Sequence, residues 1–319
     1  MNQPWSVQLE LAEGCNRLCT FCGLNGIRDK PGSYRCMTVD TAYKLAPELA
    51  ELCPLARYEF AMHGEPLANP DHVMIISVFR AYLPKAQMQV TTNGIRLLGH
   101  MQERLDALFD KAGVDFVILD TYRPERDKLR REVATLKGIR VLDFYEQMVP
   151  AGQSPWHNNK RAMQRTLVVM DDLEARSGEV ASRVILNHAG SNPTKAVPKE
   201  PLRKTCTLPF RELTVTWNGH VNVCCMDWKH EYTAGRALER SLKEIWYGAE
   251  MEAARAMLQN KDRGFGPCAA CDAGSGSRAG LLPKYPPVTA EQREVVKRVE
   301  AGSPRGSNAV FVRKLKVVS

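Results

Sequence analysis

The sequence lacks any segment that would tie the chain to a membrane or to an export route. No apolar run in its 319 residues is long enough to cross a bilayer. Residues 1–5 have neither the basic start nor the apolar stretch of a signal peptide. We therefore expect a cytoplasmic protein. Its 44% hydrophobic and 25% charged residues are typical of a globular chain with material for one large domain or two modest ones.

Cysteine, by contrast, is abundant. Ten Cys could form disulfides in a secreted chain, but clustered Cys without an export signal are more typical of metal ligands. The net charge of +8 and the pI of about 9.0 favour anionic partners such as phosphorylated substrates, acidic proteins or nucleic acid.

The first group of thiols lacks a fourth ligand. Cys15, Cys19 and Cys22 have the spacing C-x3-C-x2-C, and only a tightly curved loop can point all three at one centre. Soft thiolates at this spacing select zinc or an iron–sulfur cluster. Structural zinc normally has four protein ligands, and no further Cys or His lies close by. Three thiolates on a four-iron cubane leave one iron open to react; the alternatives are a partial zinc knuckle or three unrelated buried thiols.

Alternating sequence patterns predict a parallel sheet. Strands are predicted at residues 6–11, 57–62, 88–94, 114–119, 138–145 and 182–186, and helices at 38–52, 70–82, 97–112 and 123–137. This alternation is typical of an α/β fold with helices outside the sheet, in which ligands bind at the carboxyl ends of the strands. The first cysteine loop follows the first strand at that edge. The polar loop at 150–160 is a candidate substrate lid.

Polar side chains follow several of these strands. Glu65 offers a carboxylate after the second strand, and Thr92 and Asn93 end the third. Strand ends also supply the candidates for general acid–base chemistry, which are Asp120, Tyr122, Tyr145 and His188.

The first cysteine loop resembles that of the radical S-adenosylmethionine (SAM) superfamily, in which an aromatic residue, here Phe21, precedes the last Cys. The resemblance implies a partial (β/α)6 TIM-like barrel. It implies a 4Fe–4S cluster held by Cys15, Cys19 and Cys22, with SAM chelating the fourth iron. It also implies that one electron cleaves SAM to a 5′-deoxyadenosyl radical, which takes a hydrogen atom from the substrate.

Later motifs extend the resemblance and imply which residues contact SAM. The segment from Gly64 to Pro66 is similar to the family's Gly-Gly-Glu-Pro segment, which binds the SAM amino group, except that His63 replaces the first Gly. We interpret His63 as a packed histidine or as a contact to substrate or cluster. The implied SAM contacts are Phe21, Gly64, Glu65, Pro66, Thr92, Asn93, Asp120 and Asn187.

A second group of cysteines follows a Pro- and Lys-rich linker at 191–205. Asn218–Gly219 predicts a hairpin between strands 213–217 and 220–224, and a helix is predicted at 241–258. Spacing alone fits either zinc or a cubane. The group resembles the auxiliary-cluster "twitch" module, a shortened SPASM domain. The resemblance implies a single auxiliary 4Fe–4S cluster, held by Cys206, Cys224, Cys268 and Cys271.

Cys225 is surplus to this set. Because adjacent hairpin residues point to opposite faces, we interpret it as a buried thiol; it could instead replace Cys224 as a ligand or donate hydrogen to a substrate radical. Cys36 and Cys53 are interpreted as structural. The expected domains are a radical SAM core at 1–190, the linker at 191–205, the auxiliary-cluster domain at 206–282 and a basic tail at 283–319.

We expect a radical SAM enzyme, an oxidoreductase or an isomerase, that abstracts hydrogen from a polar substrate that is phosphate-bearing, nucleoside-like or sugar-like. One alternative is a phage-type isomerase in thymine or DNA-base hypermodification, and another is an enzyme that modifies peptides. A zinc-stapled, non-catalytic nucleic-acid-binding protein is the alternative from another class. We expect a monomer that takes electrons from a reductant such as flavodoxin or ferredoxin. The basic tail is either a solvated segment or an arm that contacts phosphates, including those of nucleic acid.

Overall fold

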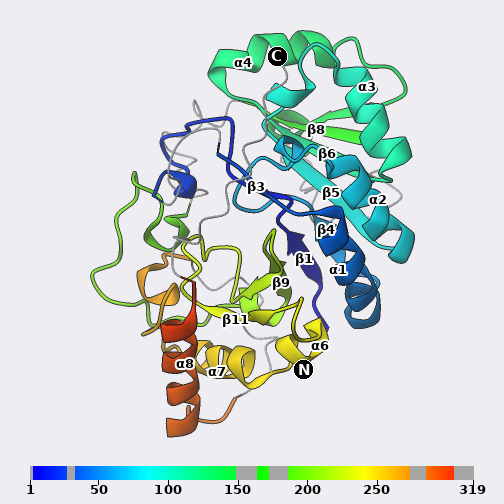
Figure 1. Ribbon diagram of the computed structural model, residues 1–319. Helices are drawn as coiled ribbons and strands as arrows, with labels where there is room; N and C mark the ends of the chain where they lie inside the picture. Colours follow the sequence, from blue (N-terminus) through cyan, green and yellow to red (C-terminus); the bar gives the residue numbers. More distant parts are fainter. Residues whose placement is uncertain (1–2, 27–32, 149–163, 172–185, 274–284, 305–319) are drawn as a thin grey trace.

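The computed structural model describes residues 3–26, 33–148, 164–171, 186–273 and 285–304. Its central feature is a nine-stranded sheet in the order β11-β10-β9-β1-β4-β5-β6-β8-β7 (Figure 1). The parallel strands of the N-terminal part are β1 (Ser6–Leu9), β4 (Arg57–Glu59), β5 (Gln87–Thr92), β6 (Phe116–Asp120), β7 (Arg140–Asp143) and β8 (Thr166–Met170). The short strands β2 (Ala12–Glu13) and β3 (Arg35–Cys36) form a separate antiparallel pair.

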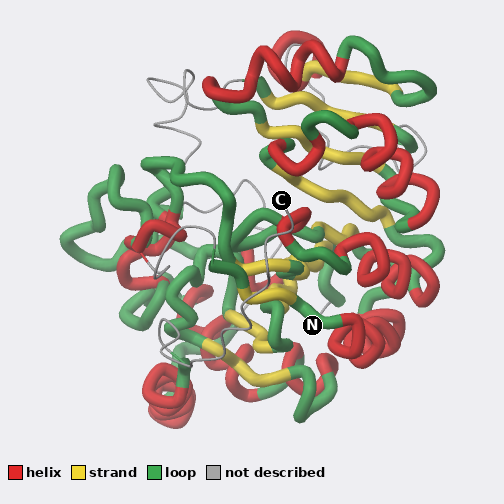
Figure 2. Tube along the Cα trace, turned by 45° about the horizontal axis from the view of Figure 1, so that its top comes forward, coloured by secondary structure: helices red, strands yellow, loops and turns green. Residues whose placement is uncertain are grey.

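Helices pack on the outer face of this sheet, as predicted (Figures 1 and 2). They are α1 (Val39–Leu52), α2 (His72–Tyr82), α3 (Met101–Asp106) and α4 (Arg123–Val133). Thr38 is the N-cap of α1, because its hydroxyl accepts a hydrogen bond from Thr41 N at 3.1 Å. The predicted helix at 97–112 begins only at Met101, and its last turn, Ala107–Lys111, is π-helical.

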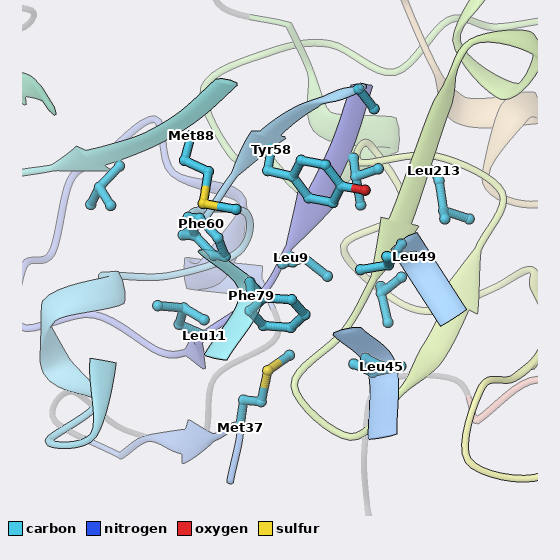
Figure 3. Close-up of a cluster of buried hydrophobic side chains, with 14 of the residues drawn as sticks. Leu9, Leu11, Met37, Leu45, Leu49, Tyr58, Phe60, Phe79, Met88 and Leu213 are labelled. Atoms are coloured by element: carbon cyan, nitrogen blue, oxygen red, sulfur yellow. The ribbon is translucent and has the colours of Figure 1, made fainter. Parts of the chain in front are cut away.

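Successive side chains of a strand point to opposite faces of the sheet, so one face contributes to the core and the other to the site. Side chains on the outer face of the strands meet α1 and α2 in a fully buried core; Figure 3 labels Leu9, Tyr58, Met88, Leu45, Leu49 and Phe79 among them. Four of the intervening positions, with side chains on the opposite face, are polar and line one cavity: Gln8, Glu59, Thr91 and Asp120. On β6 and β8 this face also carries a smaller apolar cluster that includes Phe116, Ile118 and Val168.

The sheet continues across the expected boundary between the two domains. Strand β9 (Glu212–Val215) pairs with β1 in parallel, and β10 (His220–Asn222) and β11 (Thr233–Arg236) extend the edge in antiparallel fashion. The predicted hairpin at Asn218–Gly219 is therefore confirmed. Its first strand, β9, pairs with β1, so main-chain hydrogen bonds join the C-terminal part to the N-terminal part.

Two helices replace the single one predicted at 241–258. They are α6 (Leu242–Trp246) and α7 (Ala249–Gln259), and Gly248 lies between them with extended backbone angles. A Cβ on Gly248 would lie 2.5 Å from the Glu244 carbonyl oxygen, so only glycine allows the chain to turn here. The last described helix, α8 (Ala290–Gly302), packs on α7 and β11 through Val295, Val296 and Val299.

The order of the last strands was not foreseen. β8 lies between β6 and β7 in the sheet, although it follows both in the chain. The candidate lid at 150–160, residues 182–185 of the predicted sixth strand and the end of the basic tail from residue 305 lie outside the described residues. No helix in the described part of the chain is long and apolar enough to cross a bilayer.

Candidate active site

The first cysteine set (Cys15, Cys19 and Cys22) lies in the loop between β2 and a short 3₁₀ helix, Gly23–Gly26. All three cysteines are thiols that are not joined in disulfides. Cys15 Sγ accepts hydrogen bonds from Arg17 N at 3.4 Å and from Asn93 Nδ2 at 3.5 Å. Burial raises the pKa of Cys15 to about 12, and Glu65 and the other two thiols add to the rise. The three thiols are thus close enough to interact, as the spacing predicts.

Glu65 lies beside this set, and three hydrogen-bond donors hold its carboxylate. It is 2% exposed. One carboxylate oxygen accepts from Leu67 N at 3.1 Å and from Thr92 Oγ1 at 2.7 Å, and the other accepts from Asn93 N at 2.9 Å. Burial raises the pKa of Glu65, and these donors act against the rise. The carboxylate is therefore held in one orientation at the edge where ligands of α/β folds bind.

Gly64 lies where the main chain of two segments comes very close. A Cβ at Gly64 would lie 2.2 Å from the Ala12 carbonyl oxygen and 2.4 Å from that of Gly14. The backbone at Gly64 also forms a parallel bridge with Gly14, and Glu65 N donates to Gly14 O at 2.9 Å. Glycine is required here because the chain leading into the cysteine loop approaches so closely.

These groups surround a cavity of about 390 Å³. The predicted residues that line it are Cys15, Cys19, Cys22, Phe21, Gly64, Glu65, Thr92, Asn93, Asp120, Tyr122 and His188. Three other predicted site residues do not line this cavity. Tyr145 packs edge-on against Phe144, Pro66 begins a buried 3₁₀ turn, and Asn187 Nδ2 donates to Ala270 O at 2.7 Å.

The cavity has an acidic wall that the sequence patterns did not predict. Glu59 accepts hydrogen bonds from Thr91 Oγ1, at 2.5 Å, and from Gln89 Nε2. Burial raises the pKa of Glu59 to about 7. Burial likewise raises the pKa of Asp120 to about 8, and the carboxylates of Glu59 and Glu65 add to the rise. The register of the strand at 57–62 could have identified Glu59, because it is the polar position between two outward-facing aromatics.

The remaining candidates for acid–base chemistry differ in environment. Arg17 forms an ion pair with Glu125, and its guanidinium carbon lies 4.2 Å above the centre of the Tyr122 ring. Burial, and then Asp120, raises the pKa of Tyr122 well above its ordinary value. Burial lowers the pKa of His188 to about 4, so this imidazole is neutral at pH 7.

The second cysteine set (Cys206, Cys224, Cys268 and Cys271) is buried in the C-terminal part. Burial raises the pKa of Cys224 well above its ordinary value; the adjacent Cys225 and then the three other thiols of the set add to the rise. All four thiols are therefore neighbours. Burial also raises the pKa of Cys225, where the next contribution comes from Glu212. Cys206 adds to this rise, so Cys225 lies near the set, and its role as a buried thiol or as an alternative ligand stays a prediction.

A buried cation accompanies the second cysteine set and was also missed. Arg263 is 2% exposed and donates to three main-chain carbonyls, those of Lys204, Thr205 and Ala273, at 2.8–3.0 Å. Burial raises the pKa of Cys268, and Arg263 is among the groups that act against the rise. A fixed positive charge here favours a group of thiolates.

One wall of the cavity connects the two cysteine sets. The Trp228 ring lies 4.6 Å from the His63 ring and 4.8 Å from the His188 ring, measured between centroids. A Cβ on Gly23, the residue after Cys22, would lie 2.7 Å from Trp228 Cδ2. Trp228 itself follows Cys225 by three positions.

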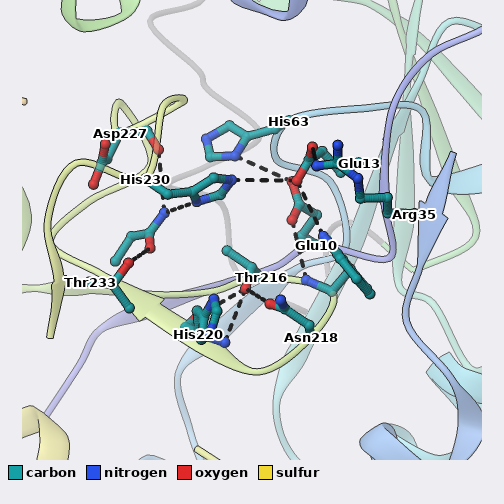
Figure 4. Close-up of polar contacts among 12 residues, drawn as sticks. Glu10, Glu13, Arg35, His63, Thr216, Asn218, His220, Asp227, His230 and Thr233 are labelled. Atoms are coloured by element: carbon teal, nitrogen blue, oxygen red, sulfur yellow. Dashed lines mark hydrogen bonds and ion pairs between the residues drawn. The ribbon is translucent and has the colours of Figure 1, made fainter. Parts of the chain in front are cut away.

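Behind this wall lies a buried polar network (Figure 4). His63 Nδ1 lies 3.3 Å from Glu10 Oε1, and His230 Nε2 lies 3.4 Å from Glu13 Oε2. Glu13 is also paired with Arg35 at 2.5 Å. The contact between His230 and Glu13 joins the segment before the first cysteine set to the loop that follows Cys224 and Cys225.

Both cysteine sets supply ligands that an iron–sulfur cubane can use. Three thiols beside a cavity leave room for a further ligand on the fourth iron of a cubane. Four buried thiols can bind either a cubane or a zinc ion.

Comparisons with known proteins agree with this geometry. Residues 9–145 match the family model of the radical SAM superfamily, and residues 206–272 match SPASM, an iron–sulfur cluster-binding domain. The chain belongs to the radical SAM superfamily. The predicted family and fold class are confirmed, and the alternative of a non-catalytic zinc protein is excluded. This radical SAM enzyme uses SAM, a 4Fe–4S cluster and an auxiliary iron–sulfur cluster.

Two curated relatives are similar in sequence. The SAM-dependent 2-deoxy-scyllo-inosamine dehydrogenase of Niallia circulans is 23% identical over 260 residues, which cover 81% of this chain and 88% of the relative. The GTP 3′,8-cyclase of Streptomyces coelicolor is 33% identical over 125 residues, but the match covers only 34% of that protein.

A solved structure shares the fold. The crystal structure of BtrN in complex with AdoMet and 2-DOIA has a TM-score of 0.64 at 21% identity, with 86% of this chain and 95% of BtrN covered. The match supports the arrangement of the radical SAM core and the C-terminal module as parts of one fold.

Proposed function

We propose that this radical SAM enzyme oxidises a hydroxyl group of a sugar-like small molecule to a carbonyl group. Its expected division into a core at 1–190 and an auxiliary-cluster domain at 206–282 would supply the two halves of the reaction. Cys15, Cys19 and Cys22 would hold the cluster that binds SAM, and the second cysteine set would hold the auxiliary cluster. When bound, SAM and its cluster supply the one-electron chemistry that removes a hydrogen atom from an unactivated carbon.

The residues of the chain would orient SAM. Glu65, held by three donors, is an acceptor for the SAM amino group, and Asn93 beside it fixes the same edge.

The observation that carries the proposal is the wall that both cysteine sets share. An alcohol that becomes a carbonyl loses one hydrogen atom, one proton and one further electron, whereas an isomerisation needs no electron acceptor. Trp228 lines the cavity and packs beside Cys22, and it belongs to the loop of Cys224 and Cys225. This adjacency supports oxidation. The dehydrogenase from Niallia circulans supports the same class of reaction.

A phosphate-bearing substrate receives less support. The described lining includes Glu59, Glu65 and Asp120, and its single cation, Arg17, is already paired with Glu125. The partial match to the GTP cyclase therefore does not lead us to propose a nucleotide. In the described part of α8, Arg293 pairs with Asp262 and Lys297 with Glu294, so these cations offer little to nucleic acid.

The test uses anaerobically reconstituted enzyme with SAM, a reductant and a panel of cyclitols and sugars deuterated at the carbinol carbon. We expect deuterium to appear in 5′-deoxyadenosine and a product two mass units lighter than the undeuterated substrate, in equal amounts. A product of unchanged mass would indicate isomerisation and contradict the proposal.

A further inference from the structure

The linker before the second cysteine set carries a group of exposed cations. Lys199, Arg203 and Lys204 all face solvent. None of their side chains forms a hydrogen bond or an ion pair with the residues that the structure describes. Glu200 is the one acidic residue in the sequence between positions 191 and 205. The segment therefore presents positive charge that is available to an acidic partner.

The same segment is packed on the chain that carries the second cysteine set. At its end, Arg263 donates to the carbonyl oxygen of Lys204 at 2.9 Å. Near its start, Asn187 Nδ2 donates to the carbonyl oxygen of Ala196 at 3.4 Å and to that of Ala270 at 2.7 Å. Ala270 lies between the last two cysteines of the set. Both ends of the segment are thus held beside the thiols.

An apolar side chain accompanies these cations. Val197 is 51% exposed, which makes it one of the large apolar side chains that face solvent. A Cβ on Gly190 would lie 3.2 Å from Val197 Cγ2 and 3.3 Å from Ala270 Cβ, so Val197 and Ala270 pack close to the same glycine. An apolar centre with a charged rim is the composition of many protein interfaces, and electron-transfer complexes are among the smallest of these.

The second cysteine set is itself inaccessible to a partner. Its four thiols are each at most 8% exposed. Under the proposed oxidation, each turnover leaves one electron at this set, and that electron must leave before the next turnover. An acceptor can therefore approach only through the chain that covers the thiols, and the linker segment is part of that cover.

We propose that Val197, Lys199, Arg203 and Lys204, here called the linker surface, dock a small acidic one-electron carrier protein in its oxidised form. The substrate radical loses one electron and becomes the carbonyl product, and the carrier gains that electron by way of the auxiliary cluster. This inference rests on the proposed function for the source of the electron. A nucleic acid receives less support, because it is bound through many phosphate contacts and has no use for the exposed valine.

The first test is equilibrium binding of an oxidised flavodoxin, a small acidic flavoprotein, to the anaerobically reconstituted holoenzyme without substrate or reductant. We expect the combined variant Lys199→Gln, Arg203→Gln and Lys204→Gln to bind it about tenfold more weakly than the wild type. The affinity of the wild type should also fall more steeply as salt is added. Val197→Asp, which places a negative charge in the centre of the linker surface, should weaken binding as well.

The matched control removes the same number and kind of charges elsewhere. Lys85→Gln, Arg104→Gln and Lys111→Gln change exposed cations near the helices on the outer face of the sheet. This combined variant should keep the affinity of the wild type. Iron content and unfolding temperature, measured for every variant, verify that each chain is folded and loaded.

The second test measures electron transfer from the second cysteine set alone. In the Cys19→Ala background, the enzyme is chemically reduced, freed of excess reductant and mixed with oxidised flavodoxin in a stopped-flow instrument. We expect the flavin semiquinone to form with a second-order rate constant that is about tenfold lower when the three linker cations are replaced. The control substitutions should leave this rate constant unchanged.

Three results would overturn the inference. The first is that the wild type does not bind flavodoxin, or that the linker variant binds it as tightly as the wild type does. The second is weaker binding with an unchanged rate of semiquinone formation. The third is that the linker variant loses affinity for a DNA duplex and not for flavodoxin, which would make the surface a nucleic-acid site. Failure of the deuterium experiment, with docking intact, would instead count against oxidation alone.

Discussion

The imidazole Nε2 of His63 lies 2.9 Å from the carbonyl oxygen of Cys225. The main-chain carbonyl oxygen of His63 accepts a hydrogen bond at 3.4 Å from the backbone N–H of Gly14, the residue before Cys15. His63 therefore contacts the chain beside both cysteine sets, and its ring packs on Trp228. The histidine that replaces the family's first glycine thus has a packing role in joining the two halves of the site.

Gly23→Ala tests the wall that Trp228 forms. The added methyl would lie 2.7 Å from Trp228 Cδ2, so the indole must move. Overpacking of this kind costs about 1–3 kcal/mol of unfolding free energy, measured by denaturant titration. We also expect a changed tryptophan emission and less product for each SAM cleaved. Gly302→Ala is the control, because no described atom lies within 4 Å of the position that its Cβ would occupy. Identical behaviour of the two variants would contradict the packing account.

Arg263→Met tests the buried cation beside the second cysteine set. Loss of a positive charge makes reduction of a nearby cluster less favourable. We expect the midpoint potential of the auxiliary cluster to fall by about 60 mV or more, since ~1.4 kcal/mol corresponds to about 59 mV for one electron. Redox titration followed by electron paramagnetic resonance measures it. Arg293→Met, which removes a half-exposed surface cation, should leave the potential unchanged. An unchanged potential in Arg263→Met would refute the electrostatic role.

Several parts of the site could be predicted from the sequence because they depend on local spacing. The three thiols of the first loop, Glu65 and Asn93 follow predicted strands, and parallel strands end at the same edge. The capping of α1 by Thr38 and the hairpin at Asn218–Gly219 are local in the same sense.

Other parts depend on contacts between residues that are distant in the chain. Arg263 reaches carbonyls that lie 58 and 59 residues earlier, and His63 reaches a carbonyl 162 residues later. Strand order is of the same kind: after Thr166 the run at β8 is apolar, and no local feature indicates that it lies between β6 and β7. Glu59 was missed for another reason, since only the strand register shows that its side chain faces the cavity.

Asp120→Asn should change the pH dependence of stability in the enzyme without substrate. Burial raises the pKa of Asp120 from 3.8 to about 8, so the folded protein holds this proton more tightly than the unfolded chain. Ionisation therefore destabilises the wild type progressively as the pH rises between those two values. The neutral amide does not ionise. We expect the stability of Asp120→Asn relative to the wild type to grow across this window by at least ~1.4 kcal/mol, the equivalent of one pKa unit.

Thermal or denaturant unfolding at pH 5, 7 and 9 measures this difference. These pH values lie on both sides of the raised pKa of Asp120, about 8. Glu103→Gln, at an exposed site, should follow the wild type at every pH. A stability difference for Asp120→Asn that does not vary with pH would contradict the raised pKa.

Cysteine variants separate the two clusters. Cys19→Ala removes a ligand of the cluster that we propose to bind SAM, so it should abolish SAM cleavage. Cys268→Ala should leave SAM cleavage and remove product formation, because only the second cysteine set is changed. Formation of 5′-deoxyadenosine and of product is measured in each. SAM cleavage at the wild-type rate in Cys19→Ala would refute the ligand assignment. Cys53→Ala is the control, because this thiol belongs to neither cysteine set.

The most direct test of the account is iron and sulfide analysis of the anaerobically reconstituted wild type, together with a SAM-cleavage assay. Two cubanes predict about eight irons and eight sulfides per chain, with 5′-deoxyadenosine formed on reduction. Zinc without sulfide, and no cleavage of SAM, would contradict the assignment of both cysteine sets.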